Sequence, residues 1–121
     1  MGNNPMSIDI SIVIPVYDEE QNLSPLHQEL TQVLSGYGRT YELIFVDDGS
    51  LDGSFELLAN IQLADPRVRV IRFRKNFGQT EAFAAGVTHA RGKIVVTSDA
   101  DLQNDPHVIP AMVDRLEEGF D

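Results

Sequence analysis

The sequence contains no cysteine among its 121 residues, and this absence removes two classes of site. Without thiols the chain forms no disulfide and offers no thiolate ligand to a metal, which fits a cytosolic protein. The amino terminus lacks the basic and apolar regions of a signal peptide, and no window reaches the roughly 18 apolar residues that span a membrane. We therefore expect this stretch of chain to be cytoplasmic and soluble.

Basic residues are also scarce. Nine Lys and Arg stand against 19 Asp and Glu, which gives a net charge of −10. Proteins that bind duplex nucleic acid neutralise its phosphates with basic side chains, so nucleic acid is excluded as a partner. A ligand that carries phosphates needs its charge offset locally, and a divalent cation held by carboxylates does this.

The glycine motifs of several nucleotide sites are missing. Neither G-x-G-x-x-G nor G-x-x-x-x-G-K-[ST] follows an apolar run, which disfavours a Rossmann dinucleotide site and a P-loop. Without cysteine or G-x-S-x-G, nucleophilic hydrolase chemistry has no support. The three histidines lack the spacing of a zinc site, so we interpret them as surface residues on helices: His27, His89 and His107.

Four apolar runs are present, over residues 8–16, 41–46, 68–73 and 93–98, and a helical pattern follows each. The runs are mostly continuous rather than alternating, which is typical of a parallel sheet covered on both faces. We predict a doubly wound α/β fold with a mostly parallel sheet, preceded by a flexible tail over residues 1–7. Asn22 or Ser24 is the predicted cap of the first helix, with Pro25 in its first turn, and Gly86 indicates close packing of the third helix on the sheet.

Polar residues follow every one of the four runs, at residues 17–19, 47–50, 74–79 and 99–103. Because the carboxyl ends of parallel strands meet at one edge of the sheet, these loops are expected to lie together, where such sheets bind ligands. One polar loop is ordinary turn chemistry. Four adjacent ones predict a binding site.

Individual residues of these loops allow alternative interpretations. Asp99 and Asp101 suit a shared divalent cation, or they are solvated turn residues. Asp48 accepts a hydrogen bond from a uracil or guanine N–H or from a ribose hydroxyl, or it caps a turn. The Tyr17 ring packs on a base, or it is a half-buried residue at a strand end.

Cationic residues surround the third run. Arg74 and Lys75 are candidates for contact with a phosphate or a nucleotide. Arg67 and Arg69 alternate with apolar residues, which is typical of a solvated face on an edge strand.

The sequence resembles the family 2 glycosyltransferases with the GT-A fold over about residues 8 to 120. It is most similar to their polyprenyl-phosphate branch, which includes dolichyl-phosphate mannose synthases and undecaprenyl-phosphate glycosyltransferases. The motifs that carry the resemblance are Ile12-Val13-Ile14-Pro15-Val16-Tyr17-Asp18-Glu19-Glu20, Val46-Asp47-Asp48-Gly49-Ser50, Arg74-Lys75-Asn76-Phe77-Gly78-Gln79, and Asp99-Ala100-Asp101-Leu102-Gln103 followed by Asp105-Pro106.

This resemblance implies an enzyme that transfers a sugar, with inversion, from a UDP- or GDP-sugar to a polyprenyl phosphate or, alternatively, to a saccharide. It makes residues 8–121 the nucleotide-sugar-binding part, with Asp99 and Asp101 as catalytic ligands of Mg²⁺ or Mn²⁺. A lipid phosphate is already ionised near pH 7, so no general base is required. The donor-binding residues implied are Pro15, Tyr17, Glu19, Val46, Asp48, Lys75, Ala100 and Gln103.

Family members continue beyond the fourth helix with further strands, an acceptor-binding region and, in this branch, membrane-associated helices. We therefore expect these 121 residues to be a donor-binding fragment, truncated after the fourth strand-helix unit, that transfers sugar poorly or not at all. An uncovered sheet edge predicts self-association of the fragment. The full-length protein is expected at the cytoplasmic face of a membrane.

Two other function classes compete. Sugar-phosphate nucleotidyltransferases also pair an α/β fold with metal carboxylates, but they carry a glycine-rich loop after the first strand, where this chain has Pro15 to Glu20. A non-enzymatic receiver domain needs a carboxylate at the end of the third strand, where this chain has Arg72 and Arg74. Both fit the sequence less well than a glycosyltransferase.

Overall fold

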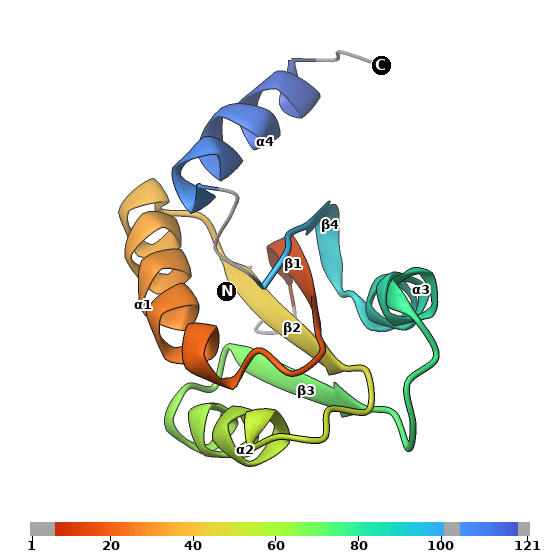
Figure 1. The fold of residues 1–121 in the computed structure, drawn as a ribbon. Coiled ribbons are helices and arrows are strands. Elements are labelled where there is room, and N and C mark those ends of the chain that lie inside the picture. Colours follow the sequence, from red (N-terminus) through yellow and green to blue (C-terminus); the bar gives the residue numbers. More distant parts are fainter. Residues whose placement is uncertain (1–6, 101–104, 119–121) are drawn as a thin grey trace.

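Strands and helices alternate along the chain in the computed structural model, which describes residues 7–100 and 105–118 (Figure 1). The four strand-helix repeats predicted from the sequence are confirmed. The elements are β1 (Ile8–Val16), α1 (Glu20–Tyr37), β2 (Tyr41–Asp47), α2 (Ser54–Ala64), β3 (Val68–Arg72), α3 (Gln79–His89), β4 (Gly92–Thr97), the 3-10 helix η1 (Pro106–Val108) and α4 (Ile109–Glu117).

The strands of the described chain form one parallel sheet in the order β3-β2-β1-β4. The chain builds outward from β1 through β2 to β3, and then returns to add β4 on the other side of β1. The direction of winding therefore reverses at β1, and open α/β sheets bind ligands outside the carboxyl ends of the strands at such a reversal. The predicted doubly wound α/β fold is confirmed.

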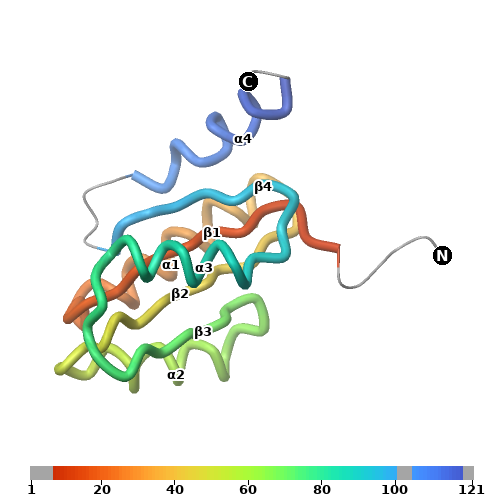
Figure 2. Tube along the Cα trace, turned by 90° about the vertical axis from the view of Figure 1, so that its right-hand side faces the viewer, coloured from red at the N-terminus to blue at the C-terminus, as the bar shows by residue number. Residues whose placement is uncertain are grey.

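Helices cover both faces of the sheet, with α3 alone on one face and α1 and α2 on the other (Figure 2). Along β1, Ile10, Ile12 and Ile14 are buried in the core with α1, α2 and α4, whereas Val13 is buried under α3. Both sets of side chains are fully buried. This two-sided burial is the reason why the run reads as continuously apolar.

Close packing of α3 on the sheet depends on Gly86. A Cβ at this position would overlap Cγ1 of Val13 in the central strand. Ala82, one turn earlier on α3, is also fully buried. The expectation that Gly86 marks close helix-sheet packing is confirmed.

The last helix, α4, is joined to the end of α1 by polar contacts as well as by the core. Ile109 and Val113 are buried in the main core. The hydroxyl of Tyr37 donates a hydrogen bond to Asp114, and Arg39 donates two to the carboxylate of Glu117, at 2.7 and 2.5 Å. Apolar side chains remain exposed on α4, at Met112 and Leu116, and just before it, at Val108.

No helix within the described ranges combines the length and apolar character needed to cross a membrane.

A buried carboxylate lies near the amino-terminal ends of the strands. Glu42 on β2 is 2% exposed and accepts hydrogen bonds from the Ser11 hydroxyl at 2.6 Å, the Arg91 N–H at 2.7 Å and the Arg69 guanidinium at 2.7 Å. Arg69 lies on an edge strand with 29% of its side chain exposed, as expected of a solvated face, but it is also bound by Glu42 on the neighbouring strand, which the sequence did not predict. Burial by itself raises the pKa of Glu42, but these hydrogen bonds and the charge of Arg69 outweigh it and lower the pKa.

We predict that Gly86→Ala destabilises the protein by about 1 to 3 kcal/mol, because the added methyl group overpacks the contact between α3 and Val13. The matched control is Gly36→Ala near the end of α1, where the added methyl meets nothing within 4 Å. This control should stabilise the helix by about 0.5 to 1 kcal/mol. Urea denaturation of both variants checks the prediction, and equal stability of the two would contradict it.

The lowered pKa of Glu42 also predicts how stability changes with pH. A carboxyl whose pKa is lower in the folded than in the unfolded state stabilises the fold above the unfolded value, about 4.3, and loses this contribution as the pH falls below it. Glu42→Gln should therefore show a smaller loss of unfolding free energy than the parent between about pH 5 and pH 3. The control, Gln28→Ala at an exposed position of α1, removes no titratable group and should follow the parent. A parent-like acid dependence in Glu42→Gln, measured by urea denaturation, would refute the role of this carboxyl.

Candidate functional site

The loops that follow β1 and β2 are bonded to each other through Asp18. Its carboxylate accepts hydrogen bonds from the N–H of Leu51 at 2.8 Å and of Asp52 at 3.3 Å, and its own N–H donates to the Ser50 hydroxyl at 2.9 Å. Asp18 adopts a φ of 53°, in the left-handed region that Asp tolerates better than most residues. The first acidic residue after β1 thus serves to hold two loops together.

The loop after β2 also sets the start of α1. The Glu19 N–H donates to the Ser54 hydroxyl at 3.1 Å, and the Glu20 carboxylate accepts from the Gly53 N–H at 3.0 Å. The helix therefore begins at Glu20, earlier than the predicted cap at Asn22 or Ser24, because the neighbouring loop supplies partners for its first turn. Pro25 lies inside the helix rather than in the first turn.

The two adjacent carboxylates at the end of β2 have different roles. Asp47 accepts a hydrogen bond from the Ser50 N–H at 3.1 Å and so closes its own turn. Asp48 contacts the loop after β3 instead. It accepts from the N–H of Phe77 at 2.7 Å, from the N–H of Gly78 at 3.0 and 3.3 Å, and from the side-chain amide of Asn76 at 3.0 Å. Asp48 is 3% exposed, so this carboxylate is buried by the loop that it binds.

Gly49 allows that loop to approach the end of β2. Its φ is 75°, and a Cβ there would overlap the backbone carbonyl carbon of Lys75 and the nitrogen of Asn76. The turn after β2 and the loop after β3 therefore touch backbone to backbone, which only glycine permits at this position.

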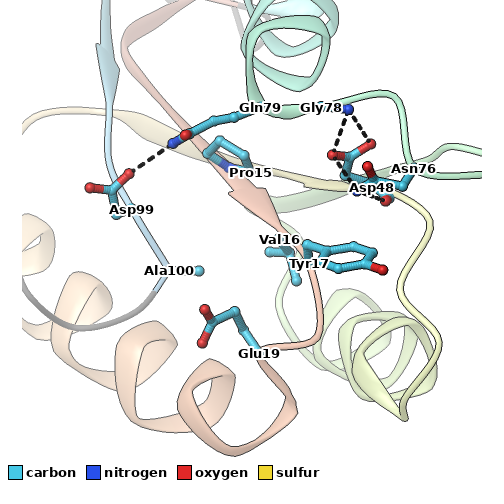
Figure 3. Close-up of a pocket in the computed structure, with 10 residues that line it drawn as sticks. All are labelled: Pro15, Val16, Tyr17, Glu19, Asp48, Asn76, Gly78, Gln79, Asp99 and Ala100. Carbon is cyan, nitrogen blue, oxygen red and sulfur yellow. Dashed lines mark hydrogen bonds between the residues drawn. The ribbon is translucent and has the colours of Figure 1, made fainter.

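A cavity of about 450 Å³ opens at the carboxyl ends of the strands, within the size range of small-molecule sites (Figure 3). Side chains from all four polar loops reach it. Tyr17 is 43% exposed there, and Asp99 accepts a hydrogen bond from the Gln79 side-chain amide at 3.1 Å. The cavity is lined by Pro15, Val16, Tyr17, Glu19, Asp48, Asn76, Gly78, Gln79, Asp99 and Ala100.

The structure brings together six of the residues proposed from the sequence: Pro15, Tyr17, Glu19, Asp48, Asp99 and Ala100. Two others do not line the cavity. Val46 is fully buried in the core under α3, and Lys75 is exposed, with its Nζ 5.3 Å from the centre of the Phe77 ring. Asp101 and Gln103 lie outside the described residues.

Four lining residues were not singled out from the sequence as site residues: Val16, Asn76, Gly78 and Gln79. The last three belong to the loop after β3, whose sequence pattern was noted only as a motif. A signal for Asn76 was present in its side chain, which can donate to a carboxylate. Its partner Asp48 is distant in sequence, so only the fold reveals the contact.

The cavity presents carboxylate oxygens, which are the ligands that hard divalent cations prefer. Asp99, at the end of β4, provides one of them beside Ala100. Over residues 7–100 and 105–118, no three acidic or histidine side chains form a group able to hold a metal ion. Of the two aspartates that the sequence predicts as metal ligands, Asp99 is the one within the described residues.

Known proteins resemble this chain in sequence. It is 44% identical over 114 residues to an uncharacterised glycosyltransferase, YkcC, of Bacillus subtilis (strain 168), a match that covers 94% of this chain and 35% of the relative. It is 42% identical over 120 residues to the dodecaprenyl-phosphate galacturonate synthase of Rhizobium johnstonii, covering 95% and 35% of the two chains. The chain thus spans about 35% of the length of these relatives.

The fold is shared with solved structures. One is glucosyl-3-phosphoglycerate synthase from Mycobacterium tuberculosis in complex with Mn²⁺, uridine diphosphate and glucosyl-3-phosphoglycerate, with a TM-score of 0.68 and 24% identity over 90% of this chain and 39% of that one. At this identity the likeness shows the GT-A fold alone. The sequence model of the family named "Glycosyl transferase family 2" matches residues 11–121. This match covers nearly the whole chain and shows that it belongs to glycosyl transferase family 2.

Proposed function

We propose that this chain is the donor-binding part of an inverting, metal-dependent glycosyltransferase that moves a sugar from a nucleoside-diphosphate sugar to a polyprenyl phosphate. One observation carries the proposal. A single cavity at the carboxyl ends of the strands is lined by an exposed aromatic ring, a buried carboxylate and the first aspartate of the Asp-x-Asp motif. These groups come from the loops after β1, β2 and β4.

The nucleotide would occupy this cavity. Tyr17 offers a ring face on which a base stacks, and Asp48 accepts a hydrogen bond from a base N–H. The diphosphate would extend toward Asp99. Glu19 lines the same cavity and accepts a hydrogen bond from the Asn22 side chain at 2.7 Å, which orients its carboxylate.

Asp99, with Asp101 after it, would hold Mg²⁺ or Mn²⁺ at this site. The Gln79 amide bonds to Asp99 and fixes the orientation of its carboxylate. When bound, the ion neutralises the charge that develops on the departing nucleoside diphosphate. The Mn²⁺ in the mycobacterial synthase of the same fold supports a divalent cation.

The acceptor is inferred from the relatives. The name of the Rhizobium relative is that of a dodecaprenyl-phosphate galacturonate synthase, and its identity of 42% supports a polyprenyl phosphate as acceptor. An ionised lipid phosphate attacks without a general base, so the proposed reaction requires none of the cavity residues to remove a proton. The same acceptor implies that the full-length protein works at the cytoplasmic face of a membrane.

We predict that the chain binds UDP or GDP only weakly without metal and at least about tenfold more tightly with Mn²⁺, because the ion screens the diphosphate from an acidic protein. Asp99→Asn should remove most of this metal dependence by weakening a charged ligand of the ion. Isothermal titration calorimetry with each nucleotide, with and without Mn²⁺, measures both effects.

The matched control is Glu56→Gln, which removes one negative charge from an exposed position of α2 outside the cavity. This variant should keep the parent's metal dependence, which separates a local ligand from a change in net charge. Failure of the parent to bind either nucleotide in a metal-dependent manner would overturn the proposed function.

A further inference from the structure

We propose that Asn76 is a positioning residue that makes the nucleotide site selective for uracil over guanine. The proposal rests on the proposed function and concerns the contact between the loop after β3 and the end of β2. The side-chain amide of Asn76 donates hydrogen bonds to the Asp48 carboxylate at 3.0 Å and to the Asp48 main-chain carbonyl at 3.2 Å. In Figure 3 both side chains lie at one end of the cavity, beside Gly78.

The acceptor capacity of Asp48 is nearly filled within the protein. A carboxylate offers about four lone-pair positions. One oxygen accepts from the N–H of Phe77, the other accepts from Asn76, and the N–H of Gly78 is shared between the two. Three donors therefore make four contacts with the carboxylate. About one further donor from a ligand can be accepted, and two cannot.

The two candidate bases differ in what they ask of a carboxylate. The Watson-Crick edge of uracil presents a single donor, N3–H, between two carbonyl oxygens. Guanine presents two adjacent donors, N1–H and the exocyclic amine, which require both oxygens of one carboxylate at once. Because the amide of Asn76 occupies one side of the Asp48 carboxylate, a single donor is satisfied and a pair of donors is not.

Asn76 can act in this way without being needed for the fold. The residue is exposed, so its truncation leaves no cavity in the core. The loop keeps other anchors, which are the N–H groups of Phe77 and Gly78 on Asp48 and the edge-to-face contact of the Phe73 and Phe77 rings at 5.6 Å. Loss of the Asn76 amide therefore frees an acceptor position on Asp48 while the loop remains attached.

The test is a titration of the 121-residue chain and its Asn76→Ala variant with UDP, GDP and inorganic pyrophosphate, each with Mn²⁺. The parent should bind UDP at least about tenfold more tightly than GDP. Asn76→Ala should weaken UDP by about tenfold, because the Asp48 carboxylate loses one of the three donors that orient it, and should reduce the preference for UDP over GDP. Pyrophosphate has no base, so its affinity should not change, which also shows that the variant is folded.

Two controls separate positioning from other effects. Asn60→Ala removes an exposed asparagine from α2, outside the cavity, and should leave all three affinities unchanged. In an Asp48→Asn background, Asn76→Ala should cause little further loss of UDP affinity, because Asn76 acts through Asp48.

The outcomes are distinct. If the parent binds neither nucleotide, the proposed function fails. If the parent binds a nucleotide but GDP as tightly as UDP, or if Asn76→Ala leaves the ratio of the two affinities unchanged, the inference about Asn76 is overturned. Additive losses in the double variant would also overturn it, since they would mean that Asn76 contacts the nucleotide independently of Asp48.

Discussion

The contact between the Asp48 carboxylate and the loop after β3 is the interaction on which the site depends. It joins two segments about 30 residues apart in the sequence, and the donors are main-chain N–H groups of Phe77 and Gly78. Gly49 permits the close approach, and the Asn76 side chain adds a further donor to Asp48. One buried carboxylate thus shapes one end of the cavity and also faces into it.

The acidic residues at this edge of the sheet divide into two groups with different physical roles. Asp18, Glu20 and Asp47 accept hydrogen bonds from loop N–H groups and hold the connections after β1 and β2 together. Asp99 and Glu19 line the cavity instead, and Asp48 belongs to both groups, because it accepts from loop N–H groups and also lines the cavity. Much of the negative charge is therefore structural, since short strand-helix connections leave N–H groups that need acceptors.

Much of the fold was predictable because its signals are local or periodic. The continuous apolar runs indicated strands buried on both faces, and Gly86 indicated close packing of a helix, since both follow from side-chain volume and hydropathy. The start of α1 and the partner of Arg69 were not predicted correctly. Each is decided by a residue on another element, Gly53 for Glu20 and Glu42 for Arg69, and no local pattern encodes such pairs. Met112 and Leu116 lie at helical spacing with Ile109 and Val113 on α4, yet only Ile109 and Val113 of these four are buried.

The sequence by itself determined the order of strands and helices and the presence of polar residues after each strand, because periodicity and residue type are properties of the chain. It also contained the family motifs, which predicted as site residues five that line the cavity: Pro15, Tyr17, Glu19, Asp48 and Asp99. Only the tertiary structure decided which polar groups face one another. It showed that β4 lies beside β1, that Val46 is buried in the core and that Asn76 bonds to Asp48. These facts depend on strand order and loop approach, which arise when distant segments pack together.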